Sequence, residues 1–238
     1  MAVAEREQQA AIELVDLETT PLRKLNQRLH DLSQAPGPTA WRIVNPNGAH
    51  AVACGLDADV GVEIEGHVGY YCAGMNKRAA VRVRGHASTG LAENMMSGLV
   101  VVDGNASQSA GATGRGGLLV VRGDAAARCG ISMKGIDIVV GGSVGHMSAF
   151  MAQTGSLVVC GDAGEALGDS IYEARLYVRG SVASLGADCV EKELRDEHGV
   201  QLAELLKAAE IEADPSDFRR YGSARQLYNF RIDNAGAY

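Results

Sequence analysis

The sequence predicts an all-β solenoid, namely a right-handed parallel β-helix of about seven 19-residue coils with helical N- and C-terminal extensions. The first observation is a five-residue pattern, apolar-x-apolar-x-Gly, where x is any residue. It recurs every 19 residues without an insertion. Its seven copies end at Gly66, Gly85, Gly104, Gly123, Gly142, Gly161 and Gly180, called the reference glycines below. The second observation is composition, because 26 of the 30 glycines lie between Gly48 and Gly186 and no proline lies between Pro46 and Pro215.

Aligning the coils on the reference glycine gives two apolar columns, four residues and two residues before it. Alternation with period 2 places both columns on one face of a short strand, so stacked coils would bury them as ladders. The columns are Val62, Val81, Val100, Leu119, Ile138, Leu157 and Leu176, and Ile64, Val83, Val102, Val121, Val140, Val159 and Val178.

Other columns predict the turns and the outer surface of the coils. We expect the reference glycine to be a turn residue with positive φ. The column seven residues after it contains only glycine and alanine, which indicates a corner where backbones approach closely. The column just before it reads Glu65, Arg84, Asp103 and Arg122. Since adjacent coils lie about 4.8 Å apart, these charges are expected to alternate along an outward ladder, with Glu63 over Arg82 repeating the pattern.

The two ends of the chain depart from the repeat. Residues 1–47 read as a lead-in, with a strand at 12–17, a helix after Thr20 and Pro21, and a connector that includes a degenerate first coil. Residues 48–188 form the β-helix. Residues 189–238 are predicted to form helices broken near Gly199, which cover the open end of the solenoid, followed by an aromatic-rich docking tail.

Composition excludes several classes of function. The formal net charge of −7 disfavours a nucleic-acid partner, because phosphate binding requires a basic surface. No apolar run approaches the length of a membrane span, and the first residues lack the apolar core of a secretory signal. The five cysteines include no Cys-x-x-Cys pair, so we expect reduced thiols and a cytoplasmic protein.

Few residues carry candidate chemistry. His67 and His86 share the column just after the reference glycine; a shared metal is the alternative, but the rest of that column is typical of a solvated turn. Cys72 and Cys129 fall in a core column, and the glycine-rich stretch 111–117 lacks the lysine and the helix of a phosphate loop. The columns assemble no nucleophile with a base. We therefore expect no catalytic, cofactor-binding or metal-binding residue on this chain.

One outward column points to an interaction. Three residues before the reference glycine stand Val101, Val120, Val139 and Val158, called the outward valine strip below. Monomers seldom leave such an apolar strip in water. Two alternatives remain: the terminal segments of the chain cover the strip, or a partner subunit does. We favour the partner and take the four valines as candidate partner-binding residues.

The coils resemble the GXGXG family. The resemblance spans residues 55–188 and is carried by stretches such as GHVGYYCAGMNKRAAVRVRG and GDAGEALGDSIYEARLYVRG. The lead-in DLETTPLRKLNQRLHDL is also similar to that of the family. This family comprises the C-terminal β-helix domain of the glutamate synthase large subunit and stand-alone relatives. The tail RRYGSARQLYNFRIDNAGAY is most similar to small separate subunits such as that of N-methylglutamate synthase.

The resemblance implies a non-catalytic structural subunit in a hetero-oligomer, because the family assigns no catalytic residue to this domain. The expected partners are a class II amidotransferase-like subunit and an FMN-binding glutamate-synthase-like subunit, which would carry the FMN and an iron–sulfur cluster. Since residues 1 and 2 are Met and Ala, the nucleophilic cysteine of an amidotransferase is also expected on another chain. The alternative is a scaffold subunit of a formylmethanofuran dehydrogenase-type complex, and a free-standing enzyme ranks third.

Overall fold

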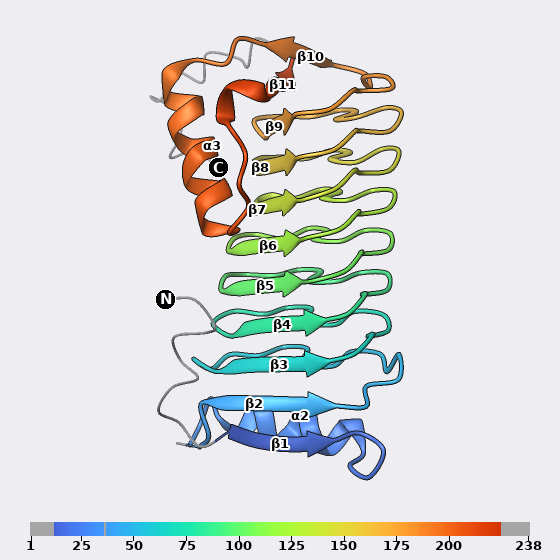
Figure 1. The fold of residues 1–238 in the computed structure, drawn as a ribbon, viewed down its shortest axis with the longest axis vertical. Coiled ribbons are helices and arrows are strands. Elements are labelled where there is room, and N and C mark those ends of the chain that lie inside the picture. Colours follow the sequence, from blue (N-terminus) through green and yellow to red (C-terminus); the bar gives the residue numbers. More distant parts are fainter. Residues whose placement is uncertain (1–11, 36, 225–238) are drawn as a thin grey trace, which may run out of the picture.

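The chain forms a parallel β-helix, as the repeat predicts. A computed structural model describes residues 12–35 and 37–224 (Figure 1). Each coil contributes one strand to an 11-stranded sheet with the order β1-β2-β3-β4-β5-β6-β7-β8-β9-β11-β10. The coil strands are β3 (Gly61–Glu65), β4 (Ala80–Arg84), β5 (Leu99–Val102), β6 (Leu118–Val121), β7 (Lys134–Val140), β8 (Thr154–Val159) and β9 (Arg175–Val178).

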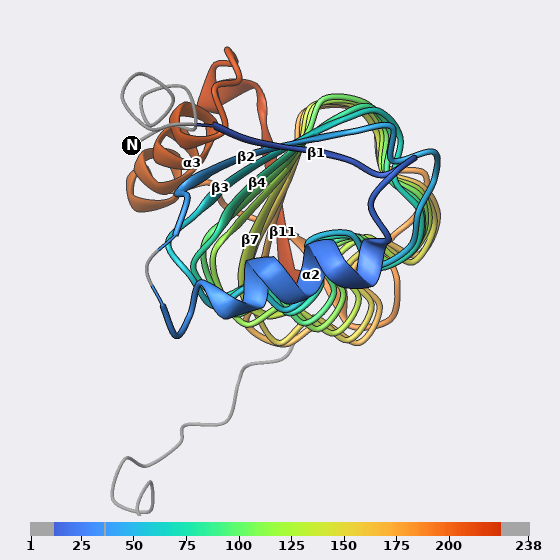
Figure 2. The ribbon, with the colours of Figure 1, turned by 90° about the horizontal axis from the view of Figure 1, so that it is seen from below.

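The strands pair in the predicted register. Val83 lies beside Val102, and Val102 beside Val121, each pair separated by 19 residues. All three side chains are fully buried, which confirms the predicted apolar ladders. A second line of contacts follows two residues after each reference glycine, where single parallel bridges join Val68 through Val182. The coils superpose when seen along the solenoid (Figure 2).

The glycine column has a different physical cause from the one we expected. Among the seven reference glycines, which all lie in the described part of the chain, only Gly66 has a positive φ, of 129°. The others are needed because the backbone of the preceding coil is too close for a side chain. A Cβ on Gly85 would lie 2.6 Å from the carbonyl oxygen of Gly66, and a Cβ on Gly180 would lie 2.5 Å from that of Gly161. Real Cβ contacts are not that short, so only glycine fits.

Positive φ occurs instead at the corner column of glycine and alanine. Ala73, Ala92 and Ala149 have φ values of 52°, 54° and 57°. This conformation lets alternate N–H groups point to opposite neighbours: the Ala73 N–H donates to the carbonyl of Val52 in the coil before, at 3.0 Å, whereas the Met75 N–H donates to the carbonyl of Glu93 in the coil after, at 2.7 Å. The predicted corner is confirmed, and small side chains there limit the strain of a left-handed residue.

The lead-in continues the sheet and closes its first end. β1 (Ile12–Asp16) and β2 (Ala40–Val44) add in parallel before β3, so the strand at 12–17 is confirmed and the degenerate coil contains a strand. The helix α2 (Leu22–Asp31) follows Pro21, which is its N-cap rather than its first residue. Leu25 and Leu29 are fully buried against the core, and α2 crosses the mouth of the first coils (Figure 2).

The C-terminal segment differs from the prediction in two respects. A single helix, α3 (Asp196–Ala208), runs through Gly199 without a break, and it lies along the side of the coils rather than over their end (Figure 1). The last coil is closed by strands instead, because β11 (Arg219–Ser223) pairs antiparallel with β9, and β10 (Cys189–Lys192) pairs with β11. A short 3₁₀ helix, η1 (Pro215–Asp217), precedes β11. Of the expected docking tail, 225–238 lies outside the described residues.

Candidate functional site

The outward valine strip is a buried interface within the chain. Its four valines lie side by side across β5 to β8, and their exposed fractions are 8% for Val101, 1% for Val120 and 0% for Val139 and Val158. They form an apolar cluster, separate from the solenoid core, with residues of α3 and the segment after it. Our expectation of a strip exposed for a partner subunit is therefore wrong. Cover by the C-terminal segment of the chain, the alternative considered above, is what the structure shows.

The helix covers the strip because its sequence supplies a matching apolar stripe. The buried side chains of α3 are His198, Leu202 and Leu206, which are spaced four residues apart and so share one helix face. Phe218, after η1, adds a buried aromatic side chain to the same cluster. Full burial of one such aliphatic side chain contributes about 1.5–3 kcal/mol, so the interface stabilises the docked helix.

Polar contacts at both ends of α3 fix its position. In the N-terminal half of α3, the side-chain oxygen of Gln201 accepts hydrogen bonds from the Arg175 guanidinium at 2.6 Å and from the Tyr177 hydroxyl at 3.2 Å. Its amide nitrogen donates to the hydroxyl of Ser156 at 3.3 Å. Beyond its C-terminal end, the Glu210 carboxylate pairs with Arg122 at 2.9 Å. α3 is thus tied to β8 and β9, and the residues just after it are tied to Arg122, which follows β6.

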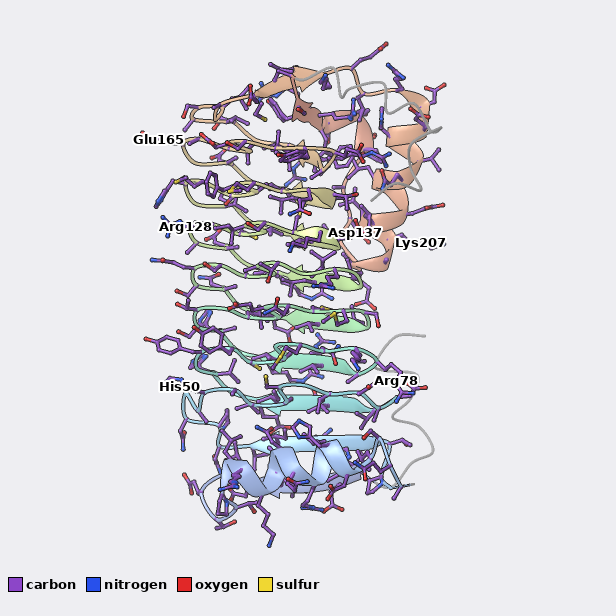
Figure 3. The ribbon with its side chains drawn as sticks, turned by 180° about the vertical axis from the view of Figure 1, so that it is seen from behind. His50, Arg78, Arg128, Asp137, Glu165 and Lys207 are labelled. Carbon is purple, nitrogen blue, oxygen red and sulfur yellow. The ribbon has the colours of Figure 1, made fainter. Side chains whose placement is uncertain are left out.

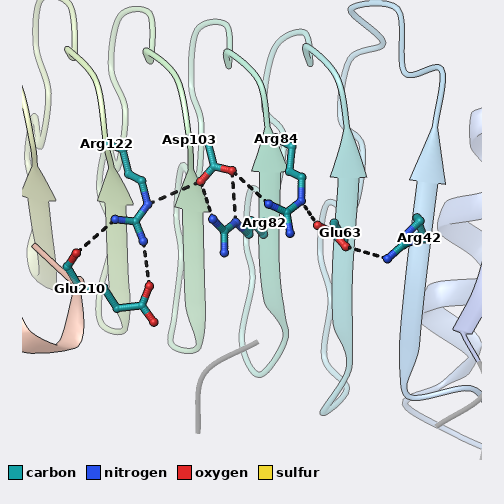
Figure 4. Close-up of polar contacts among 7 residues, drawn as sticks. All are labelled: Arg42, Glu63, Arg82, Arg84, Asp103, Arg122 and Glu210. Atoms are coloured by element: carbon teal, nitrogen blue, oxygen red, sulfur yellow. Dashed lines mark hydrogen bonds and ion pairs between the residues drawn. The ribbon is translucent and has the colours of Figure 1, made fainter. Parts of the chain in front are cut away.

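Charged side chains bridge successive coils on the outer face, largely as the ladder predicts (Figure 4). Asp103 pairs with Arg84 at 3.7 Å and with Arg122 at 3.6 Å, within one column. The second column does not form the predicted pair of Glu63 with Arg82. Arg82 reaches diagonally to Asp103 at 3.0 Å, and Glu63 pairs diagonally with Arg84 and directly with Arg42, its neighbour on β2. Exposed ion pairs contribute only about 0–1 kcal/mol each, but the Glu63 side chain is nearly buried, so losing its partners costs more.

The column just after the reference glycine forms a hydrogen-bonded ladder, called the turn ladder below. In each coil except the last, the side chain at this position accepts a hydrogen bond from the backbone N–H of the same position one coil later. The His67 Nδ1 accepts from His86 at 2.9 Å, and the His86 Nδ1 accepts from Asn105 at 2.8 Å. The ladder continues through Asn105, Asp124, Ser143, Asp162 and Ser181.

The turn ladder bears against the metal alternative for the two histidines. Their rings stack with centroids 4.8 Å apart. Because each Nδ1 accepts a backbone proton, the neutral ring must carry its own proton on Nε2, which leaves no lone pair there for a metal. No group of three potential metal ligands occurs within residues 12–35 and 37–224. Their structural role is to satisfy the backbone of the next coil.

The cysteines are part of the packing. Cys72 and Cys129 are fully buried, as the core column predicts, and burial raises the pKa of each thiol to about 12. Burial also raises the pKa of Cys189 to about 11. A thiol attacks only as a thiolate, so these groups are poor nucleophiles at neutral pH. Cys72 and Cys129 are also three coils, about 14 Å, apart, which is too far to ligate one iron–sulfur cluster.

No membrane-spanning element is found, since neither α2 nor α3, the α-helices in the described part of the chain, is long and apolar enough to cross a bilayer. The groups that sequence reasoning singled out thus serve structure: they join coils, fill the core or seat α3. Among the residues that seat α3, sequence reasoning missed Gln201, whose contacts depend on the position of α3 and leave no signal in the repeat.

Comparison with known proteins shows the family of this chain. No family model matches it, and no solved structure matches it. It is 63% identical over 226 residues to Protein GlxC of Rhizobium meliloti (strain 1021), and the alignment covers 94% of this chain and 99% of the relative. Identity at this level over nearly the whole length of both proteins means that they share the coils, the lead-in and the C-terminal segment. The chain therefore belongs to the family of Protein GlxC.

Proposed function

We propose that this chain is a non-catalytic structural subunit of a glutamate-synthase-like complex. The specific complex is N-methylglutamate synthase, which converts glutamate and methylamine to N-methylglutamate and ammonia. In this complex the chain braces a class II amidotransferase-like subunit and an FMN-binding subunit, and the FMN and the iron–sulfur cluster belong to the partner. The chain works in the cytoplasm as part of this hetero-oligomer.

One observation carries the proposal: the polar residues that repeat along the solenoid are engaged in holding it together. The side chains of the turn ladder accept from the next coil, and Glu63, Arg84 and Asp103 link neighbouring strands. Such a surface serves a brace better than an active site, because its side chains are committed before any substrate arrives. The resemblance of the coils to the GXGXG family supports the choice of partners.

The test is to purify the tagged full-length chain under native conditions from the cells that make it, and to identify co-purifying chains by mass spectrometry. The proposal expects an amidotransferase-like chain and a flavoprotein in fixed ratio to the bait. A matched control uses the same tag on the Val121→Asp variant, whose core charge should prevent folding and hence assembly. Subunits of a formylmethanofuran dehydrogenase-type complex in place of these two would contradict the proposal.

A further inference from the structure

A polar cavity lies where the coils meet the C-terminal segment. It has a volume of about 540 Å³ and is lined by the starts of β7, β8 and β9 on one side and by β10, α3 and β11 on the other. Asp137 lies in this region, between the coils and α3 (Figure 3). The lining residues used below are Asp137, Ser156, Arg175, Lys192, Gln201 and Arg220.

Three cations converge on this cavity from three different strands. Arg175 belongs to β9, Lys192 to β10 and Arg220 to β11. Within the described ranges, none of the three has a carboxylate within ion-pair distance. Arg175 donates to the neutral amide of Gln201, and Arg220 donates to the backbone carbonyl of Glu193 at 3.1 Å. Their positive charge is therefore not compensated by direct pairing.

Arg220 also keeps an unused donor. Its Nε is buried and has no hydrogen-bond partner within the described structure. A buried donor without a partner destabilises the fold, so a ligand oxygen that accepts from it would recover that cost. Burial lowers the pKa of Arg220; the nearby charges of Arg175 and Arg195 lower it further, whereas Tyr177 and Glu197 act in the opposite direction.

The acidic groups of the cavity cancel this charge only in part. Asp137 accepts hydrogen bonds from Ser156; burial raises the pKa of its carboxyl group, while those hydrogen bonds and the charge of Arg175 lower it. Glu173 is the second carboxylate in the lining, and it lies on the exposed segment before β9. Three cations thus face two carboxylates, one of which is already satisfied by neutral donors.

We propose that this cavity binds a small oxyanion, a dicarboxylate or a phosphate-bearing metabolite, through Arg175, Lys192 and Arg220. Guanidinium groups present parallel N–H donors that match the oxygens of a carboxylate or a phosphate, and an ammonium group adds a further donor. The cavity is large enough for a ligand of this class. The site does not depend on the proposed structural role, because it is contained within this chain.

Isothermal titration calorimetry on the full-length chain at low ionic strength tests the site, with succinate and inorganic phosphate as separate probes. At least one probe should bind at a single site, and its preference identifies the class of oxyanion. Lys192→Gln and Arg220→Gln should each weaken binding about tenfold or more, since each removes a charge-assisted hydrogen bond. The control is Arg115→Gln, which removes an equal charge from an exposed corner outside the cavity.

Thermal unfolding of each variant shows whether it is folded. If Arg220→Gln fails to fold, Lys192→Gln still decides the question, because the half-buried Lys192 makes no ion pair that the fold requires. Two results would overturn the proposal: no binding of either probe at about 10 mM, or an equal loss of affinity in Arg115→Gln, which would indicate general attraction to positive charge.

Discussion

Replacing Val139 with aspartate tests how α3 is held on the coils. The Val139 side chain is fully buried in the cluster beneath α3, and it points away from the solenoid core. The substitution removes about 1.5–3 kcal/mol of apolar burial. It also places a carboxylate without a partner where water is excluded, which costs about 1–3 kcal/mol more. Docking of the helix should therefore weaken by about 2.5–6 kcal/mol, which corresponds to a rise of about 70-fold or more in the undocked population.

Hydrogen–deuterium exchange measured by mass spectrometry is the assay. Amides of α3 should exchange about 70-fold faster or more in Val139→Asp, whereas those of β3 to β6 should be unchanged, because the coils retain their own core. The matched control is Val200→Asp, on the same helix at a side chain that is 60% exposed, which should leave exchange at the wild-type rate. Unchanged protection of α3 in Val139→Asp would refute the assignment of the strip as its docking surface.

Three further predictions concern the coils. Gly85→Ala should lower the free energy of unfolding by more than about 2 kcal/mol, because its Cβ would meet the Gly66 backbone. Gly199→Ala in α3, which has open space around it, should instead raise the free energy of unfolding by about 0.5–1 kcal/mol. Urea titration of both variants measures these changes. His86→Ala should lower the free energy of unfolding by about 0.5–1.5 kcal/mol in the same assay, and His86→Asn should restore most of this loss by supplying an acceptor for the Asn105 N–H. Equal stability of His86→Ala and the wild type would show that the turn ladder contributes nothing. The Cys129 thiol, with its pKa raised by burial to about 12, should resist iodoacetamide at pH 8 until the protein unfolds. Labelling of the native protein at the rate of a free thiol would contradict the assignment of Cys129 to the core. Because that thiol ionises near pH 9 when the chain is unfolded, its burial should make the folded protein less stable as the pH rises above 9.

The sequence predicts the coils well because each position repeats seven times. Val83, Val102 and Val121 are identical in type and spacing, so the inward face of the strand follows from alternation alone. The repeat does not reveal why a residue recurs. A reference glycine such as Gly85 could mark positive φ or a close backbone, and only the distance to the preceding coil decides between them.

The error over the outward valine strip has a similar origin. The repeat shows correctly that Val139 points outward, and Leu202 and Leu206 show a helix with one apolar face. Neither pattern states that the two surfaces meet, because more than 60 residues separate them and no local rule fixes the path between. Gly199 misled for a different reason: glycine in a helix costs about 1 kcal/mol, and burial of the opposite face compensates for it.

The most direct test of a structural role is to reconstitute the proposed complex with and without this chain. The amidotransferase-like and FMN-binding subunits would be purified separately, and methylamine-dependent formation of N-methylglutamate would be followed by mass spectrometry. We expect no turnover by this chain alone, and turnover by the partners that falls at least tenfold or so when the chain is omitted, together with loss of the assembled complex on gel filtration. Turnover by the isolated chain, or full activity and assembly of the partners without it, would contradict the account.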